Sequence, residues 1–174
     1  MKNKTYVLCA AAVVGAAYAV MTIALAPISY GAVQMRVSEV LCIMPLFIPG
    51  TAWGLAAGCV LANLLTGNIF DIIFGSLSTL AAAFCTAAVG RRGHSRLLTL
   101  LGCLMPVVFN AVVVGAVITA AYNGMDIFAH FGVFALNAAQ VGLGELAVML
   151  LLGYPLARFL PRQAFFRSFV EKCK

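Results

Sequence analysis

The sequence predicts an all-α integral membrane protein, a compact bundle of six transmembrane helices with both termini in the cytoplasm. Its 174 residues are 64% hydrophobic and only 9% charged, and the mean hydropathy is +1.07. Soluble domains carry about a quarter charged residues, and disordered chains have the opposite balance of charge and hydrophobicity. Apolar runs of about 20 residues indicate membrane helices, and the positions of the basic residues indicate their number and orientation.

The elements follow one another along a single membrane domain, residues 1–174. The first apolar run comes after Lys2 and Lys4 and is longer than the core of a signal peptide, so we expect it to be a membrane helix. The second and third helices are short and are separated by Pro49 and Gly50. The six helices are expected over residues 5–26, 35–48, 51–66, 69–89, 97–122 and 131–160.

Basic residues decide between five and six helices. Residues 35–65 could form one broken helix or two short ones, each rising about 22 Å, against a hydrocarbon core of about 30 Å. Lys and Arg accumulate on the cytoplasmic side. Six helices bring the amino terminus, the loop at 91–96 and the carboxyl tail to one side, where ten of the eleven basic residues then lie. The short helices must be tilted, surrounded by protein, or placed where the bilayer is thin.

Polar residues inside the predicted spans form a candidate binding site. An ionisable group costs roughly 2.5–3.5 kcal/mol at the centre of a span, so such groups usually pair and serve a function. In the six-helix arrangement, four helices bring polar side chains toward the outer half of the membrane. The substrate-binding residues that we expect are Arg36, Glu39, Asn63, Asp71, Asn137, Gln140 and Glu145.

Carboxylates and amides in this pattern favour a ligand rich in hydrogen-bond donors. On the sixth helix, Asn137, Gln140 and Glu145 fall within an arc of about 140°. A carboxylate can accept two parallel N–H bonds, and amides can satisfy carbonyl and amine groups together. Arg36 and Glu39, three residues apart, could instead form an ion pair that caps the second helix.

Other polar residues suit solvated helix ends. These are Asn68, Asn123 and Asp126.

Small residues predict close helix contacts. Ala12 and Ala16 are four residues apart on the first helix, and Ala11 and Gly15 offer a neighbouring register. Such spacing lets another helix approach closely in lipid. Glycines at the same spacing on the third helix, from Gly50 to Gly58, are typical of packing inside the protein.

Several classes of function are disfavoured. The sequence has no Gly-rich loop ending in Gly-Lys-Ser/Thr, no HExxH and no GxSxG. It has no CxxC pair and no Cys/His cluster with metal spacing. The net charge of +6 lies in short clusters beside apolar spans rather than on a face for nucleic acid. We therefore expect no cofactor, no metal, no nucleic-acid partner and no enzymatic activity.

Two stretches carry a family resemblance. Residues 26–39, APISYGAVQMRVSE, resemble the hallmark segment of the QueT family. Ala62 and Asn63, followed by residues 71–80, DIIFGSLSTL, form a second match, and the small-residue first helix and residues 137–145 fit as well. QueT proteins are regarded as the substrate-binding subunits (S components) of energy-coupling-factor (ECF) transporters.

The resemblance implies an importer subunit in a bacterial cell membrane. It implies capture of a queuosine precursor or salvage product, a 7-deazaguanine such as queuine or an aminomethyl-deazaguanine, from outside. Delivery would then need a separate transmembrane coupling subunit and a pair of ATPases. An Ala-x-x-x-Ala motif docks S components to that module. Ala12 and Ala16 match the motif, and Ala11 with Gly15 is a near match that leaves the register open.

Two other functions are compatible with the sequence. The chain could be an S component for a different vitamin, or a small membrane enzyme that uses buried acids as general acid or base. The sequence does not assign separate roles to Glu39, Asp71 and Glu145.

Overall fold

The computed structural model describes residues 4–29, 35–67 and 69–173, and within these ranges the chain forms helices and no strand. The longer helices are α1 (Lys4–Ala24), α3 (Thr51–Asn63), α4 (Ser76–Arg92), α5 (Arg96–Val117) and α6 (Phe131–Val148). The short α-helices are α2 (Ala26–Ser29), α7 (Tyr154–Phe159) and α8 (Ala164–Cys173). The 3₁₀ helices are η1 (Val37–Leu46), η2 (Leu64–Thr66) and η6 (Leu160–Arg162), and the π-helical turns are η3 (Asp71–Gly75), η4 (Ile118–Tyr122) and η5 (Met149–Gly153).

Four helical segments among the described residues are long and apolar enough to cross a membrane. They are Lys4–Ala24, Asp71–Arg92, Arg96–Tyr122 and Phe131–Arg162. Two shorter apolar helices, Val37–Leu46 and Thr51–Asn63, lie between the first and second of these. The prediction of an all-α membrane fold is therefore confirmed, whereas a count of six spans depends on the two shorter helices as well.

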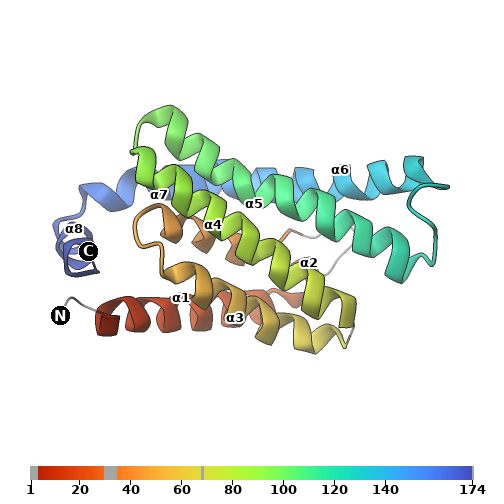
Figure 1. Cartoon of the computed structure of the whole chain (residues 1–174), viewed down its shortest axis with the longest axis horizontal. Helices are drawn as coiled ribbons and strands as arrows, with labels where there is room; N and C mark the ends of the chain where they lie inside the picture. The colour runs from red at the N-terminus through yellow and green to blue at the C-terminus, as the bar shows by residue number, and fades with distance from the viewer. Residues whose placement is uncertain (1–3, 30–34, 68, 174) are drawn as a thin grey trace.

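Helices α1 and α3 pack side by side along their glycines (Figure 1). A Cβ atom at Gly54 would overlap the backbone of Ala11, and one at Gly58 would overlap the backbone of Gly15. Only glycine therefore allows this approach, as is typical of small-residue contacts in lipid. The prediction that the glycines of the third helix serve internal packing is confirmed.

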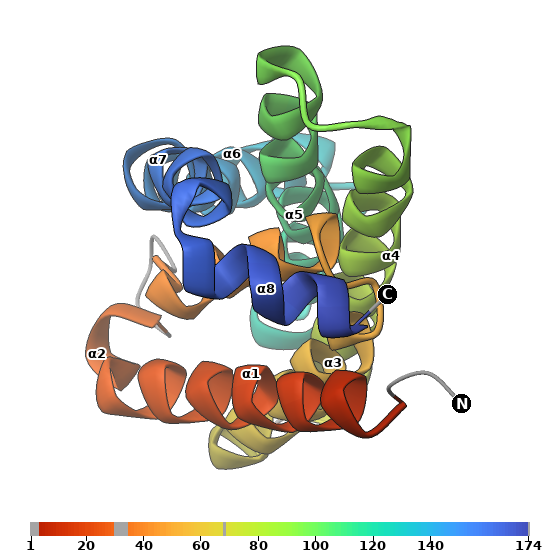
Figure 2. The ribbon, with the colours of Figure 1, turned by 90° about the vertical axis from the view of Figure 1, so that its left-hand side faces the viewer.

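The segment η1 runs through the middle of the bundle. It contacts α1, α3, α4, α5 and α6, and the view from the end of the bundle shows it as the orange segment that the other helices surround (Figure 2). It was expected as an α-helix over 35–48, but it is a 3₁₀ helix of ten residues that contains Pro45, which has no N–H to donate. Ten residues of 3₁₀ helix rise about 20 Å, and protein rather than lipid surrounds this short element.

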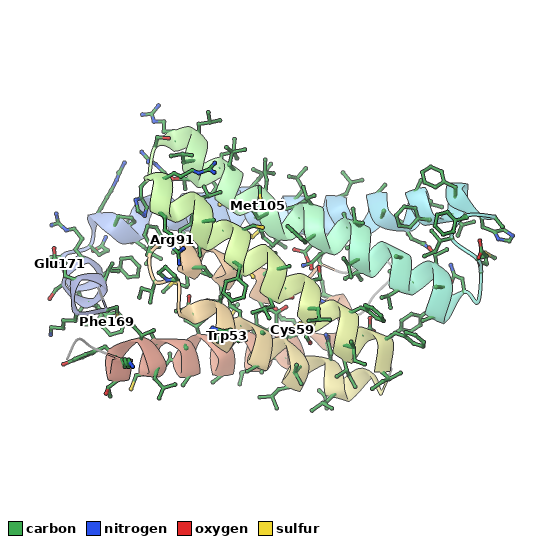
Figure 3. All side chains as sticks on the ribbon, in the orientation of Figure 1. Trp53, Cys59, Arg91, Met105, Phe169 and Glu171 are labelled. Atoms are coloured by element: carbon green, nitrogen blue, oxygen red, sulfur yellow. The ribbon has the colours of Figure 1, made fainter. Side chains whose placement is uncertain are left out.

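The beginning of α1 and the end of α8 lie at the same end of the bundle (Figures 1 and 2). The sequence did not predict α8, whose aromatic side chains tie it to this end. The ring centroids of Phe169 and Tyr6 are 6.4 Å apart, and those of Phe166 and Phe47 are 5.3 Å apart. Arg91, at the end of α4, points toward this same end (Figure 3).

Candidate functional site

The carboxylate of Glu39 lies at the centre of the protein and accepts two hydrogen bonds. Glu39 is fully buried in the first turn of η1. The hydroxyl of Tyr18, on the inner face of α1, donates to Oε1 of Glu39 over 2.5 Å. The thiol of Cys42, one 3₁₀ turn along η1, donates to Oε2 over 2.9 Å. Burial of a carboxylate is costly unless hydrogen bonds compensate it, so these two donors hold Glu39 in place.

A second carboxylate, that of Glu145 on α6, is joined to two other helices. Its Oε1 accepts a hydrogen bond from Nδ2 of Asn110 on α5 over 3.0 Å. The Oδ1 of Asn110 accepts in turn from the hydroxyl of Ser78 on α4, over 2.8 Å. The other oxygen of Glu145, Oε2, is buried and has no hydrogen-bond partner among the described residues. That oxygen can therefore accept from a bound molecule.

Electrostatics join the two carboxylates to Arg36. The guanidinium of Arg36 is buried and attracts both Glu39 and Glu145, which repel each other. We call Arg36, Glu39 and Glu145 the central cluster. Two buried carboxyl groups thus share one buried guanidinium. A ligand rich in hydrogen-bond donors fits these carboxyl oxygens, one of which has no partner among the described residues.

Asn63, the last residue of α3, and Asp71, the first residue of η3, form a neighbouring pair. The amide Nδ2 of Asn63 donates to the backbone oxygen of Asp71 over 2.9 Å. The Oδ2 of Asp71 accepts from the hydroxyl of Tyr122 over 2.5 Å. Tyr122 ends the π turn η4, and Asp71 begins the π turn η3. Single π turns within helices are frequent at functional sites.

The thiol of Cys59 lies between this pair and the central cluster. It is fully buried in the middle of α3, and Figure 3 shows it in the interior of the bundle. Its sulfur accepts from Nδ2 of Asn63 and from the hydroxyl of Thr79, each over 3.4 Å, and lies 3.7 Å from the hydroxyl of Tyr18. A continuous set of polar contacts therefore runs from Asp71 through Asn63, Cys59 and Tyr18 to Glu39.

The two amides predicted on α6 lie farther along that helix. Nδ2 of Asn137 donates to the hydroxyl of Thr119 in η4 over 2.9 Å. Gln140 is half-buried one turn away. Asn137 thus helps to hold α6 against η4. No hydrogen bond found among the described residues joins Gln140 to Arg36, Glu39 or Glu145.

The small residues of α1 divide between two faces. Ala11 and Gly15 are buried against α3, whereas Ala12 and Ala16 are exposed. The two pairs that the sequence offered therefore differ in exposure. Of these two pairs, Ala12 and Ala16 are the one that lies on an exposed face of α1.

Sequence reasoning brought out Arg36, Glu39 and Glu145 but missed several of their contacts. The missed residues are Tyr18, Cys42, Cys59, Asn110 and Tyr122. A buried asparagine within an apolar run was a usable signal for Asn110, because such a group needs partners. Tyrosine and cysteine are common in apolar helices and gave no such signal.

The expectation that Asn68 is a solvated helix end falls outside the described residues. Among the described residues, no group of three or more His, Cys, Asp or Glu side chains could hold a metal ion.

The fold and the central cluster define a multi-pass α-helical membrane protein with an acid-rich polar site inside its bundle. The model of the QueT transporter family matches residues 8–162, and the chain belongs to this family. The resemblance to the QueT family is thereby confirmed.

A curated relative matches part of the chain. It is the queuosine precursor transporter QueT of Lactococcus lactis subsp. cremoris (strain MG1363), 40% identical over 81 residues. The match covers 45% of this chain and 48% of that protein, so the chain spans about half the length of the curated relative. No solved structure matches the chain.

Proposed function

We propose that this chain is the substrate-binding subunit of an ECF-type importer and that it captures a 7-deazaguanine from outside the cell. The observation that carries the proposal is the central cluster, in which two buried carboxylates face a single guanidinium. The name of the Lactococcus relative supports a queuosine precursor as the substrate.

The chemistry of a 7-deazaguanine suits these side chains. Its N1–H and 2-amino group present two parallel donors, the geometry that a carboxylate accepts best. The unpartnered Oε2 of Glu145 is an acceptor for such a donor. An aminomethyl substituent would add a cation, which the second acid, Glu39, can balance. Asn63, Asp71, Asn137 and Gln140 are the further proposed substrate contacts, and the two amides of α6 would reach the ligand from farther along that helix.

The topology proposed for this function has six spans with both termini in the cytoplasm. It counts η1 and α3 as the two short spans. The three basic clusters support it, because α1 begins, α4 ends and α8 lies at the same end of the bundle. An excess of Lys and Arg at one end is typical of the cytoplasmic side. The central cluster is then reached from outside.

Docking to the coupling subunit is assigned to Ala12 and Ala16. Both are exposed on α1, whereas the competing register is occupied by α3. Small residues four apart let a partner helix approach closely, and larger side chains there would hold it away. The coupling subunit and its pair of ATPases supply the energy for uptake.

The test replaces Ala12 and Ala16 together by Leu and measures co-purification with the coupling subunit and uptake of substrate. We expect both to be lost while the isolated chain still binds substrate. The matched control is Ala135 and Ala139 replaced by Leu, since these alanines are also four apart and exposed, on α6. Assembly and uptake that survive the α1 change, or are lost equally in the α6 control, would contradict the docking assignment. Chemical conversion of a bound deazaguanine would instead favour an enzyme.

A further inference from the structure

Helix α1 exposes small residues on one face and buries Tyr18 on the other. Ala16 is exposed on the face proposed to dock the coupling subunit, and Tyr18 is fully buried on the other face. Two residues along an α-helix correspond to a rotation of about 200°, so the two side chains point in nearly opposite directions. A displacement of this turn of α1 therefore moves both at once.

Two short hydrogen bonds tie α1 to the first turn of η1. The hydroxyl of Tyr18 lies 2.5 Å from Oε1 of Glu39, and the hydroxyl of Thr22, one turn further along α1, lies 2.6 Å from that of Ser38. All four residues are fully buried. A hydrogen bond in a buried site is electrostatically stronger than the same bond at a surface.

The segment that receives these bonds is a weak helix. Runs of 3₁₀ helix beyond three or four residues are uncommon because their hydrogen-bond geometry is poor, and a longer stretch often marks a functional hinge. Here η1 is ten residues long and contains Pro45. Side-chain contacts, rather than its own backbone ladder, therefore fix where η1 holds Glu39.

We infer that Tyr18 is a positioning residue that orients the carboxylate of Glu39 for substrate and links that carboxylate to the docking helix. The inference rests on the function proposed above, and Thr22 supplies the second link. A carboxylate oxygen has two lone pairs, so Glu39 can accept from substrate and from Tyr18 at once. Substrate at Glu39 then biases the position of α1, and docking at α1 biases the affinity for substrate by the same factor, because such coupling is reciprocal.

The test removes the hydroxyl with Tyr18→Phe, which keeps the ring that fills the core. The two readouts are the substrate affinity of the purified chain and the uptake rate at saturating substrate with the coupling module in liposomes. The probes are 7-aminomethyl-7-deazaguanine and queuine. We expect the affinity to fall about tenfold and the saturating uptake rate to fall at least threefold. The control is Tyr6→Phe, the same change at an exposed position of the same helix, and it should alter neither.

Each result bears on a separate part of the inference. An unchanged affinity overturns the positioning of Glu39, and an unchanged saturating uptake rate overturns the link to α1. If Tyr18→Phe does not fold, Thr22→Val tests the link, since it breaks the second tie without touching Glu39. It should keep the affinity within twofold and still slow saturating uptake threefold, and normal uptake would overturn the link. A wild-type chain that binds neither probe contradicts the proposed function, and this inference with it.

Discussion

The substitution Glu145→Gln removes one acceptor oxygen of a buried carboxyl group and keeps its shape. Glutamine can keep the hydrogen bond that Asn110 makes to Oε1 over 3.0 Å. It replaces the unpartnered acceptor Oε2 with an NH₂ group, which is a donor. A substrate N–H that faced Oε2 would then meet another donor. The change therefore removes an acceptor and a charge at the point where a ligand is expected, while the contact to α5 stays.

The magnitude follows from the kind of bond that is lost. A hydrogen bond to a charged group is worth about 1.5–3 kcal/mol, which corresponds to a loss of affinity of about 10- to 150-fold. Folding should be maintained, because the variant loses repulsion from Glu39 as well as attraction to Arg36. We therefore expect at least a tenfold rise in the Kd for a deazaguanine, with an unchanged expression level.

The assay is isothermal titration calorimetry on the purified chain in nanodiscs. The matched control is Glu171→Gln, which makes the same change at an exposed position of α8, at one end of the bundle (Figure 3). Its Kd should equal that of the wild type. A Kd for Glu145→Gln within twofold of the wild-type value would refute the assignment of Glu145 to the substrate.

Three further changes test the packing and the polar contacts. Gly54→Ala places a Cβ against the backbone of Ala11 and should lower the free energy of unfolding by about 1–3 kcal/mol, which is measured as a lower Tm. The control is Gly132→Ala, where a Cβ meets no atom within 4 Å. Equal Tm values for the two variants would contradict the packing account. Tyr122→Phe removes the bond to Asp71 and should lower the Tm, whereas a Tm equal to that of the wild type would show that the bond does not stabilise η3 and η4. Ser95→Ala removes the side-chain cap of α5 and should cost about 1 kcal/mol by chemical denaturation, and no change would mean that solvent replaces the cap.

The sequence carried enough information for the membrane class and for the residues of the central cluster. Arg36, Glu39 and Glu145 interrupt apolar runs, and the cost of burying such groups makes them conspicuous. Their grouping also followed from helical order along the chain. The exposed placement of Ala12 and Ala16 could not be derived, because it depends on which register α3 occupies.

What escaped prediction depends on contacts between distant segments. The hydroxyl of Tyr18 becomes part of the site only because η1 places the carboxylate of Glu39 beside it. The 3₁₀ geometry of η1 depends on the surrounding helices, which favour a narrow central element over the α-helix expected from its composition. The expected helices end at residue 160 and leave out α8, although Phe166, Phe169 and Val170 have helical spacing and pack on the end of the bundle.

Direct binding to the purified wild-type chain tests the central claim, that the acid-rich site inside the bundle captures a 7-deazaguanine. The panel contains 7-aminomethyl-7-deazaguanine, queuine, queuosine and guanine, with riboflavin and thiamine as controls. The account predicts tight, stoichiometric binding of at least one 7-deazaguanine and none of the two vitamins. Binding of a vitamin with none of the deazaguanines would contradict the proposed substrate, and the absence of any binding would contradict substrate capture by this chain.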